Sequence, residues 1–493
     1  MVGPESPGAL KETVAPATAT RSSRVSTHFV IAAAIVLGAA AVRVPGLFSD
    51  FWLDEIWSLD NALAAASWTD IFLIRFDNNH HLNSLYLWLI GDGAPLPVYR
   101  LPAFAAGIAS VVGAWALAAR EGRFPAIVTC VTFSLSYLLV YYSSEARGYA
   151  LVVLFSLAGW LVVQRHAERP SKGHILVLAA CAVLGVMAHR TFVLFLVGAY
   201  VWFDVHAQRR YPIRQATRLT WSLFALPAVI VGLGVIALRN TTVGGGPAYW
   251  IWNIYAKTAS TLVGGPATGT LMWIVAAIVA GLFVRALVQD IRAGDDRWIF
   301  YGTTVVIVPV ILGLFGRPET VSPRYLIVPA AFALLSISIS VGRGLEKTGR
   351  IRLLALVSTA LLVGLGLTHF RPINRGQYRS AIGEMLVATA SEPVTVASGD
   401  RFGGHAFRTT MVLNFYRRRL ADGPRVSYID ANHYPASGAE WMIVESPDPE
   451  SASPVYLDRF GRSFRLQQEY LASEISGVTW HLYRRADDRP SSR

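Results

Sequence analysis

The chain has 493 residues, of which 53% are hydrophobic and only 15% are charged, and its mean hydropathy is +0.42. Because soluble domains carry roughly 25% charged residues, this composition excludes a soluble globular enzyme. The formal net charge of +12 does not indicate nucleic acid as a partner, because the basic residues lie in short segments between long apolar runs.

These apolar runs are close to the roughly 20 residues that a helix needs to cross a bilayer. About eleven such spans follow one another: 27–46, 98–119, 124–142, 148–164, 174–188, 191–205, 220–238, 268–288, 299–316, 324–341 and 353–370. The sequence therefore predicts an α-helical polytopic membrane protein with a transmembrane domain over 27–370. The preceding residues 1–26, rich in Pro, Ala, Ser and Thr, are expected to form a disordered cytoplasmic tail.

Arginine and lysine concentrate in alternate short loops between the spans, for example at Arg120, Arg165, Arg209 and Arg343. The positive-inside rule assigns such loops to the cytoplasm, and this places the N-terminus inside. The protein is expected in the plasma membrane. Because the number of predicted spans is odd, the chain should end on the side opposite to its N-terminus, so everything after residue 370 is expected to be extracytoplasmic.

The first outward loop, 47–97, contains the sequence FWLDEIWSLD at 51–60, with the adjacent acids Asp54 and Glu55. Carboxylates at the lip of a membrane span are costly to desolvate, which favours a functional role for them. Two alternatives remain open from the residues alone: Asp54 as a helix N-cap and Glu55 as a partner of the helix dipole. Aromatic amphipathic patterns at 56–67 and 81–90 predict interfacial helices in this loop.

Four further polar segments fall at the same, outward ends of the spans. They are NNHHLNSLY at 78–86, YYSSEARGY at 141–149, AHRT at 188–191 and RPETVSPRYL at 317–326. Their convergence on one side of the membrane is the main functional signal in the sequence.

Residues 371–493 have a different pattern, which predicts a small extracytoplasmic α/β domain. A helix is expected over 375–390, and strands over 393–398, 425–430, 440–445 and 478–485. The only two cysteines, Cys130 and Cys181, lie in apolar spans and are expected to be packing residues.

The ordered motifs resemble those of the GT-C class of membrane glycosyltransferases, in particular the family of protein O-mannosyltransferases and lipid A aminoarabinose transferases. The similar segments are LDE at 53–55, HHLNSLYLWL at 80–89, SEARGYAL at 144–151, HRTF at 189–192 and RYLIVPA at 324–330. Gly148 stands where this family usually has proline.

The resemblance implies inverting transfer of a sugar, such as mannose, from a polyprenyl-phosphate donor to an extracytoplasmic glycan, lipid or protein. Asp54 would be the general base, and Glu55 would assist it or help it to hold Mg²⁺ or Mn²⁺; no cofactor is otherwise indicated. Arginine suits the donor phosphate because its planar fork donates to two oxygens. The expected donor-phosphate ligands are Arg324, Tyr325, Arg147 and Arg190, and the expected substrate-binding residues are His80, His81, Glu145 and His189.

Other interpretations stay open at this point. Arg324 could snorkel to the interface, Arg147 could pair with Glu145, and the histidines could be packing residues. The whole chain could instead be a transporter or flippase of a lipid-linked sugar, although such proteins place ionisable groups near the bilayer midplane. A non-catalytic scaffold would leave Asp54 and Glu55 without a purpose.

Overall fold

A computed structural model describes residues 19–76, 78–238, 241, 250–315, 322–368, 375–389, 393–399, 406–429, 434–446, 452–473, 475 and 477–486. The first helix, α1, begins at Ala19, inside the tail predicted over 1–26, while residues 1–18 lie outside the described part. The predicted outward loops 239–267 and 317–323 are described only in part.

The helical body contains the apolar helices that the sequence predicts. Its elements are α1 (Ala19–Leu47), α4 (Leu96–Ala118), α5 (Arg123–Leu135), α6 (Tyr137–Tyr142), α7 (Tyr149–Glu168), α8 (Lys172–Ala188), α9 (Phe192–Gln208), α10 (Ile213–Leu238), α11 (Ile251–Leu262), α12 (Gly269–Arg292), α13 (Arg297–Gly302), the π-helical turn η2 (Thr303–Ile307), α14 (Val308–Phe315), η4 (Pro323–Leu326), α15 (Ile327–Leu345) and α16 (Gly349–Thr368). Among the described residues, seven helices are long and apolar enough to cross a membrane, and four further apolar helices are shorter. They coincide with the eleven predicted spans, so the multi-pass helical fold is confirmed.

Three details differ from the prediction. The span at 124–142 is divided at Ser136, whose backbone leaves the helical conformation and whose hydroxyl caps α6. The span at 299–316 contains the π-helical turn η2. The predicted loop 239–267 contains a helix, α11.

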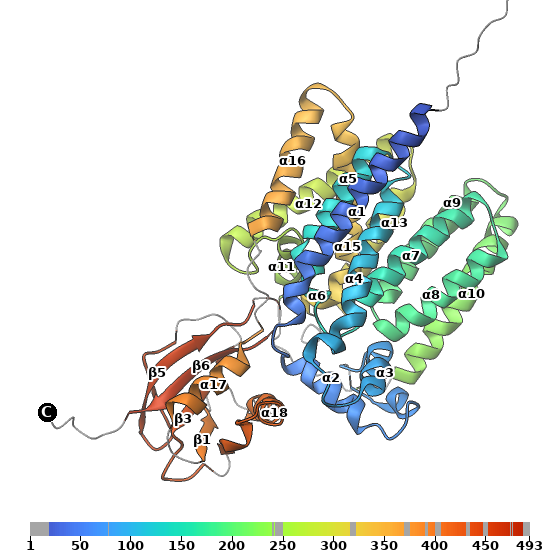
Figure 1. The fold of residues 1–493 in the computed structure, drawn as a ribbon. Coiled ribbons are helices and arrows are strands. Elements are labelled where there is room, and N and C mark those ends of the chain that lie inside the picture. Colours follow the sequence, from blue (N-terminus) through green and yellow to red (C-terminus); the bar gives the residue numbers. More distant parts are fainter. Residues whose placement is uncertain are drawn as a thin grey trace, which may run out of the picture.

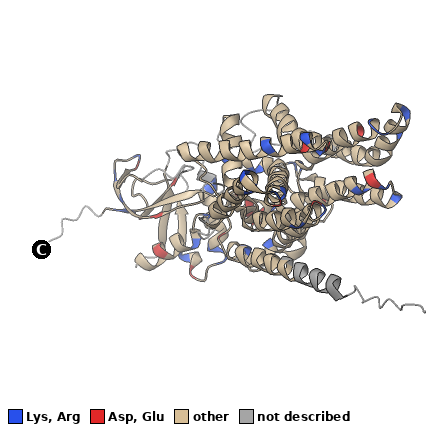
Figure 2. Cartoon of the chain, turned by 90° about the horizontal axis from the view of Figure 1, so that it is seen from above, with Lys and Arg blue, Asp and Glu red and all other residues tan. Residues whose placement is uncertain are grey.

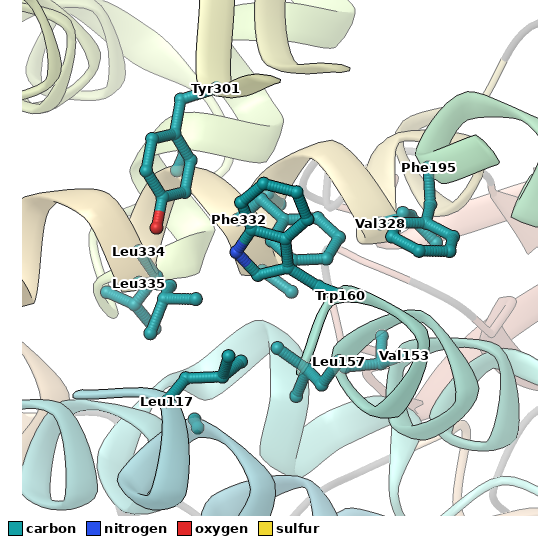
Figure 3. Packing of buried hydrophobic residues seen from close by; sticks show 14 of the residues in the cluster. Leu117, Val153, Leu157, Trp160, Phe195, Tyr301, Val328, Phe332, Leu334 and Leu335 are labelled. Carbon is teal, nitrogen blue, oxygen red and sulfur yellow. The ribbon is translucent and has the colours of Figure 1, made fainter. Parts of the chain in front are cut away.

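The core of the helical body surrounds α15, which is buried along almost its whole length. Trp160 of α7 stacks on Phe300 of α13, with ring centroids 3.6 Å apart, and Phe300 meets Phe332 of α15 edge-on at 4.8 Å. Figure 3 shows Trp160 and Phe332 side by side among leucine and valine side chains of α4, α7 and α15. This packing fixes α7 and α15, whose ends carry candidate site residues.

The first loop folds at the end of the helical body that adjoins the C-terminal domain (Figure 1). It contains α2 (Leu53–Ala64), the short helix η1 (Asp70–Leu73) and α3 (His81–Ile90). Several Lys and Arg residues lie at helix ends remote from the C-terminal domain (Figure 2).

The C-terminal domain is an α/β structure, as predicted. Its elements are α17 (Tyr378–Ala388), β1 (Val394–Ser398), α18 (Ala406–Arg417), η5 (Gly423–Arg425), β2 (Val426–Ile429), β3 (Trp441–Ser446), β4 (Val455–Leu457), β5 (Ser463–Tyr470) and β6 (Thr479–Arg485). The sheet order is β2-β1-β3-β6-β5-β4, with β1 parallel to β2 and β3 and the other pairs antiparallel. Sequence patterns did not indicate α18, β4 or β5, because these elements lack a clean apolar period.

The C-terminal domain and the first loop share one hydrophobic core. Phe51 stacks on Phe415 of α18 with ring centroids 5.8 Å apart, and the hydroxyl of the buried Tyr416 donates to the Phe51 carbonyl at 3.0 Å. Ile56 and Leu59 of α2 belong to the same buried cluster. The domain is therefore packed onto the loop that carries Asp54 and Glu55.

Candidate active site

Asp54 lies in the first turn of α2 and connects two arginines from distant parts of the chain. Its Oδ2 accepts from Arg147 Nη1 at 2.7 Å and from Arg324 Nη1 at 2.5 Å. The helix begins at Leu53 with Trp52 as the residue at its N-cap, so the alternative of Asp54 as an N-cap is wrong. Arg324 pairs with Asp54 instead of simply snorkelling, and its side chain keeps 22% of its surface exposed.

Asn78 helps to fix the direction of the Arg147 guanidinium. Arg147 Nη2 donates to Asn78 Oδ1, and Asn78 Nδ2 donates to the Asp54 backbone carbonyl at 3.0 Å. The guanidinium also lies over the ring of Tyr149, 4.9 Å from its centroid. Because its two terminal nitrogens have different fixed partners, Arg147 presents its planar fork in one orientation.

An aromatic wall borders these charges. His80 meets Tyr149 edge-on at 5.1 Å between ring centroids, and His189 lies 4.9 Å from both His80 and Tyr149. Tyr325 stacks on His189 at 5.6 Å, next to Arg324. The structure therefore brings together four segments that are far apart in the sequence.

The turn after Arg147 closely approaches His80 and the end of α8, and this approach depends on Gly148. A Cβ atom at this position would lie 1.9 Å from the carbonyl oxygen of Ala188 and 2.9 Å from His80 Nδ1. His80 Nδ1 is also 3.1 Å from that carbonyl and 3.3 Å from the Gly148 nitrogen. Glycine thus lets the turn after Arg147 contact the end of α8.

His81 and Arg190 lie to one side of this group. His81 stacks on Phe72 with ring centroids 5.4 Å apart. Burial, together with the nearby charge of Arg190, lowers the pKa of His81 to about 4. The two histidines of the HH pair therefore have different surroundings, and His80 is the one that faces Tyr149 and His189.

Glu55 faces away from Asp54 into a buried ion pair, although both were predicted as catalytic residues. Its two oxygens accept from Arg100 Nε at 2.8 Å and Arg100 Nη2 at 2.7 Å, and Oε1 also accepts from the Ala146 backbone at 2.8 Å. The side chains of both Glu55 and Arg100 are 0% exposed. This geometry corrects the expectation that Glu55 assists Asp54 directly, because successive helical residues point about 100° apart.

Glu145 is likewise fully buried, and its carboxyl faces Arg375 of the C-terminal domain. Arg375 Nε lies 3.8 Å from Glu145 Oε1 and 3.9 Å from Glu55 Oε2. The alternative pairing of Arg147 with Glu145 is therefore wrong, since Arg147 pairs with Asp54. The predicted role of Glu145 in substrate binding stays a prediction, and in this structure its carboxyl is directed to Arg375.

The pKa values of Asp54, His80 and His189 are shifted by burial and by the neighbouring arginines. Burial by itself raises the pKa of Asp54, but the charges of Arg147 and Arg324 outweigh it and hold the pKa below its ordinary value. Burial and the charge of Arg147 keep the pKa values of His80 and His189 well below the ordinary range. At neutral pH the cluster therefore contains an ionised carboxylate, two guanidinium ions and two neutral imidazoles.

In the described part of the site, Asp54 and Glu55 do not form a pair of metal ligands. Within the described ranges, no group of three or more His, Cys, Asp or Glu side chains is arranged to hold a metal ion. The Asp54 carboxylate is committed to two arginine cations, and Glu55 is committed to Arg100. A cation placed between them would face like charges at short range.

The sequence patterns did not single out Arg100, Arg375 or Asn78 as functional residues. Arg100 had a usable signal, because an arginine within an otherwise apolar span is costly unless it has a partner. Arg375 had none, because arginine at the start of a water-exposed domain is commonplace.

No protein-family model matches this chain, and no curated protein matches it. Among solved structures, ArnT from Cupriavidus metallidurans in the apo state is similar, with 12% identity, a TM-score of 0.46, and coverage of 94% of this chain and 98% of that chain. ArnT bound to undecaprenyl phosphate gives 11% identity, a TM-score of 0.42, and coverage of 96% and 100%. The Archaeoglobus fulgidus oligosaccharyltransferase in complex with zinc and sulfate is also similar. It gives 10% identity, a TM-score of 0.43, and coverage of 83% of this chain and 68% of that chain.

Proposed function

We propose that this protein transfers a sugar from a polyprenyl-phosphate donor to a hydroxyl of an extracytoplasmic glycan, lipid or protein. The observation that supports this most is the pair of contacts from Arg147 and Arg324 to one oxygen of Asp54. Two guanidinium groups that already converge on one anionic oxygen are suited to a phosphate. The five motifs that resemble the GT-C class favour the same reaction class.

The location of the cluster suits a lipid-borne donor. Arg147 lies two residues before α7, and Arg324 lies in η4, three residues before α15, so both arginines lie at ends of membrane helices. A polyprenyl tail could remain in the bilayer while its phosphate reached the arginines. By the distribution of basic loops, we propose that this end faces the outside of the plasma membrane and that the N-terminus is cytoplasmic.

In the proposed reaction, the acceptor hydroxyl attacks the anomeric carbon from the face opposite the phosphate and loses its proton to Asp54. The bond between the anomeric carbon and the phosphate oxygen breaks, its electron pair leaves with the polyprenyl phosphate, and the configuration is inverted. Arg147 and Arg324 stabilise the negative charge that develops on the leaving phosphate. No step requires a metal.

Asp54 has the protonation state that a general base needs, because its lowered pKa keeps it ionised at neutral pH. Its two arginine partners also weaken it as a base in the free protein. A bound phosphate would compete for both guanidinium groups, so donor binding is expected to raise the basicity of Asp54. In this scheme His80, His189 and Tyr325 shape the sugar pocket, while Glu55 positions α2.

The direct test is release of polyprenyl phosphate. Purified protein in lipid would be incubated with polyprenyl-phosphate mannose, arabinose, galactose and aminosugars, together with envelope glycan, lipid and peptide acceptors. The proposal expects release that depends on the acceptor. Translocation of an intact lipid-linked sugar across a vesicle membrane, without release of polyprenyl phosphate, would instead support a flippase and contradict the proposal.

A further inference from the structure

Arg375, the first described residue of the C-terminal domain, is buried next to the candidate active site. Arg375 is fully buried, and its Nη1 donates to Ser49 Oγ at 2.5 Å. Its Nη2 donates to Ser144 Oγ at 3.1 Å and to the Tyr141 carbonyl at 3.2 Å. The guanidinium also lies 4.6 Å from the centroid of the Tyr141 ring. One side chain thus connects the first loop with the segment that precedes Arg147.

The same guanidinium contributes to the charge balance of the buried acids. Glu55, Glu145 and Arg100 would leave an excess negative charge whenever Glu145 is ionised, and Arg375 lies within 4 Å of both carboxyl groups. Burying an unpaired charge is strongly destabilising, so a cation is needed there. Each acid is directly linked to the site: Glu55 follows Asp54 on α2, and Glu145 is two residues before Arg147.

The turn from Ser143 to Gly148 is held from several directions, one of which is the C-terminal domain through Arg375. Asn83 Nδ2 donates to the Ala146 carbonyl at 2.6 Å, and the Ala146 nitrogen donates to Glu55. Arg375 holds the beginning of the turn through Ser144. Displacement of Ser144 would therefore be transmitted over three residues to the Arg147 guanidinium.

We propose that Arg375 is a positioning residue of the active site, through which the C-terminal domain holds the 143–148 turn so that Arg147 reaches Asp54. This inference rests on the proposed function for its effect on catalysis, but its structural part does not. The C-terminal domain is then a component of the catalytic unit, in addition to any role in acceptor binding.

The test uses three variants: Arg375→Met, Glu145→Gln and the double variant that carries both changes. Arg418→Ala is the control. Arg418 is a matched control because it also joins the C-terminal domain to α2, pairing with Asp60 at 3.5 Å, but its side chain is 62% exposed. The double variant removes one charge of each sign, so it should melt within a few degrees of the wild type even if Arg375→Met folds poorly.

The first readout is modification of Arg147 by phenylglyoxal, measured by peptide mass spectrometry on full-length protein in lipid. The Arg147 side chain is 2% exposed in the wild type and should be protected there, in Glu145→Gln and in Arg418→Ala. In the double variant the rate of modification should rise at least tenfold although the melting temperature is retained. Protection of Arg147 in the folded double variant would overturn the inference.

The second readout is turnover with the donor and acceptor found active for the wild type. The double variant should lose at least tenfold in kcat, while Arg418→Ala should retain the wild-type rate. An unchanged kcat in the double variant would overturn the positioning role. If Arg147 becomes reactive as expected but the wild type releases no polyprenyl phosphate from any donor, the proposed function fails and the positional relationship stands.

Discussion

Asp54 Oδ2 lies 2.5 Å from Arg324 Nη1, although 270 residues separate them in the chain. Arg147 Nη1 contacts the same oxygen from a third segment. A carboxylate shared by two arginines neutralises only one of the two positive charges. The site therefore keeps an excess of positive charge, which suits a donor phosphodiester that carries one negative charge and gains a second as the sugar leaves.

Replacing Asp54 by Asn should abolish turnover, with a loss of roughly 10²-fold or more, because the change keeps the shape and removes the base. Release of polyprenyl phosphate measures it. Asp60→Asn is the matched control, since Asp60 lies on the same helix, is partly exposed and pairs with Arg418. A near-normal rate for Asp54→Asn, with the protein folded, would show that Asp54 is not the base.

Replacing Arg324 by Ala should weaken binding of the donor more than binding of the acceptor. Loss of a charge-assisted hydrogen bond costs about 1.5–3 kcal/mol, which corresponds to roughly 10- to 100-fold in donor affinity. Titration with the polyprenyl-phosphate sugar gives this affinity directly. Arg350→Ala, an exposed arginine near the start of α16, should change nothing. Equal donor affinity in the wild type and Arg324→Ala would remove Arg324 from the phosphate site.

Replacing Gly148 by Ala should impair both folding and turnover, because the added Cβ would lie 1.9 Å from the Ala188 carbonyl oxygen. Steric overpacking of this kind costs about 1–3 kcal/mol, and the turn must move away from α8 and His80 to relieve it. Thermal melting and turnover measure the two effects. Gly281→Ala is the control, since its Cβ would meet nothing within 4 Å. Normal activity of Gly148→Ala would show that the close approach is dispensable.

Replacing Glu445 by Gln should change how stability depends on pH. Burial raises the pKa of Glu445 in the C-terminal domain to about 7, above the ordinary value of 4.5, despite a hydrogen bond from Thr409. Because the folded state holds this proton more tightly, the stabilisation is complete below pH 4.5 and is lost as the pH rises toward and through 7. The melting temperature of Glu445→Gln relative to the wild type should therefore rise between pH 5 and pH 8. A difference independent of pH would contradict this assignment.

The sequence by itself determined the membrane body, because eleven apolar runs have few alternatives to helices that satisfy their own backbone hydrogen bonds in lipid. It also indicated Asp54, Arg147 and Arg324 as candidates, since ionic side chains at the ends of apolar spans are costly and therefore conspicuous. The predicted helix over 81–90 corresponds to α3 (His81–Ile90).

Only the tertiary structure decided which of these residues meet. Asp54 and Glu55 are adjacent and chemically alike, yet the turn of the helix directs Asp54 to Arg147 and Arg324 and buries Glu55 against Arg100. No local pattern could have separated them, because the difference lies in which partner each face of α2 meets. The approach of Arg375 to Glu55 and Glu145 was equally hidden, because it depends on docking of a domain that begins more than 200 residues later in the chain.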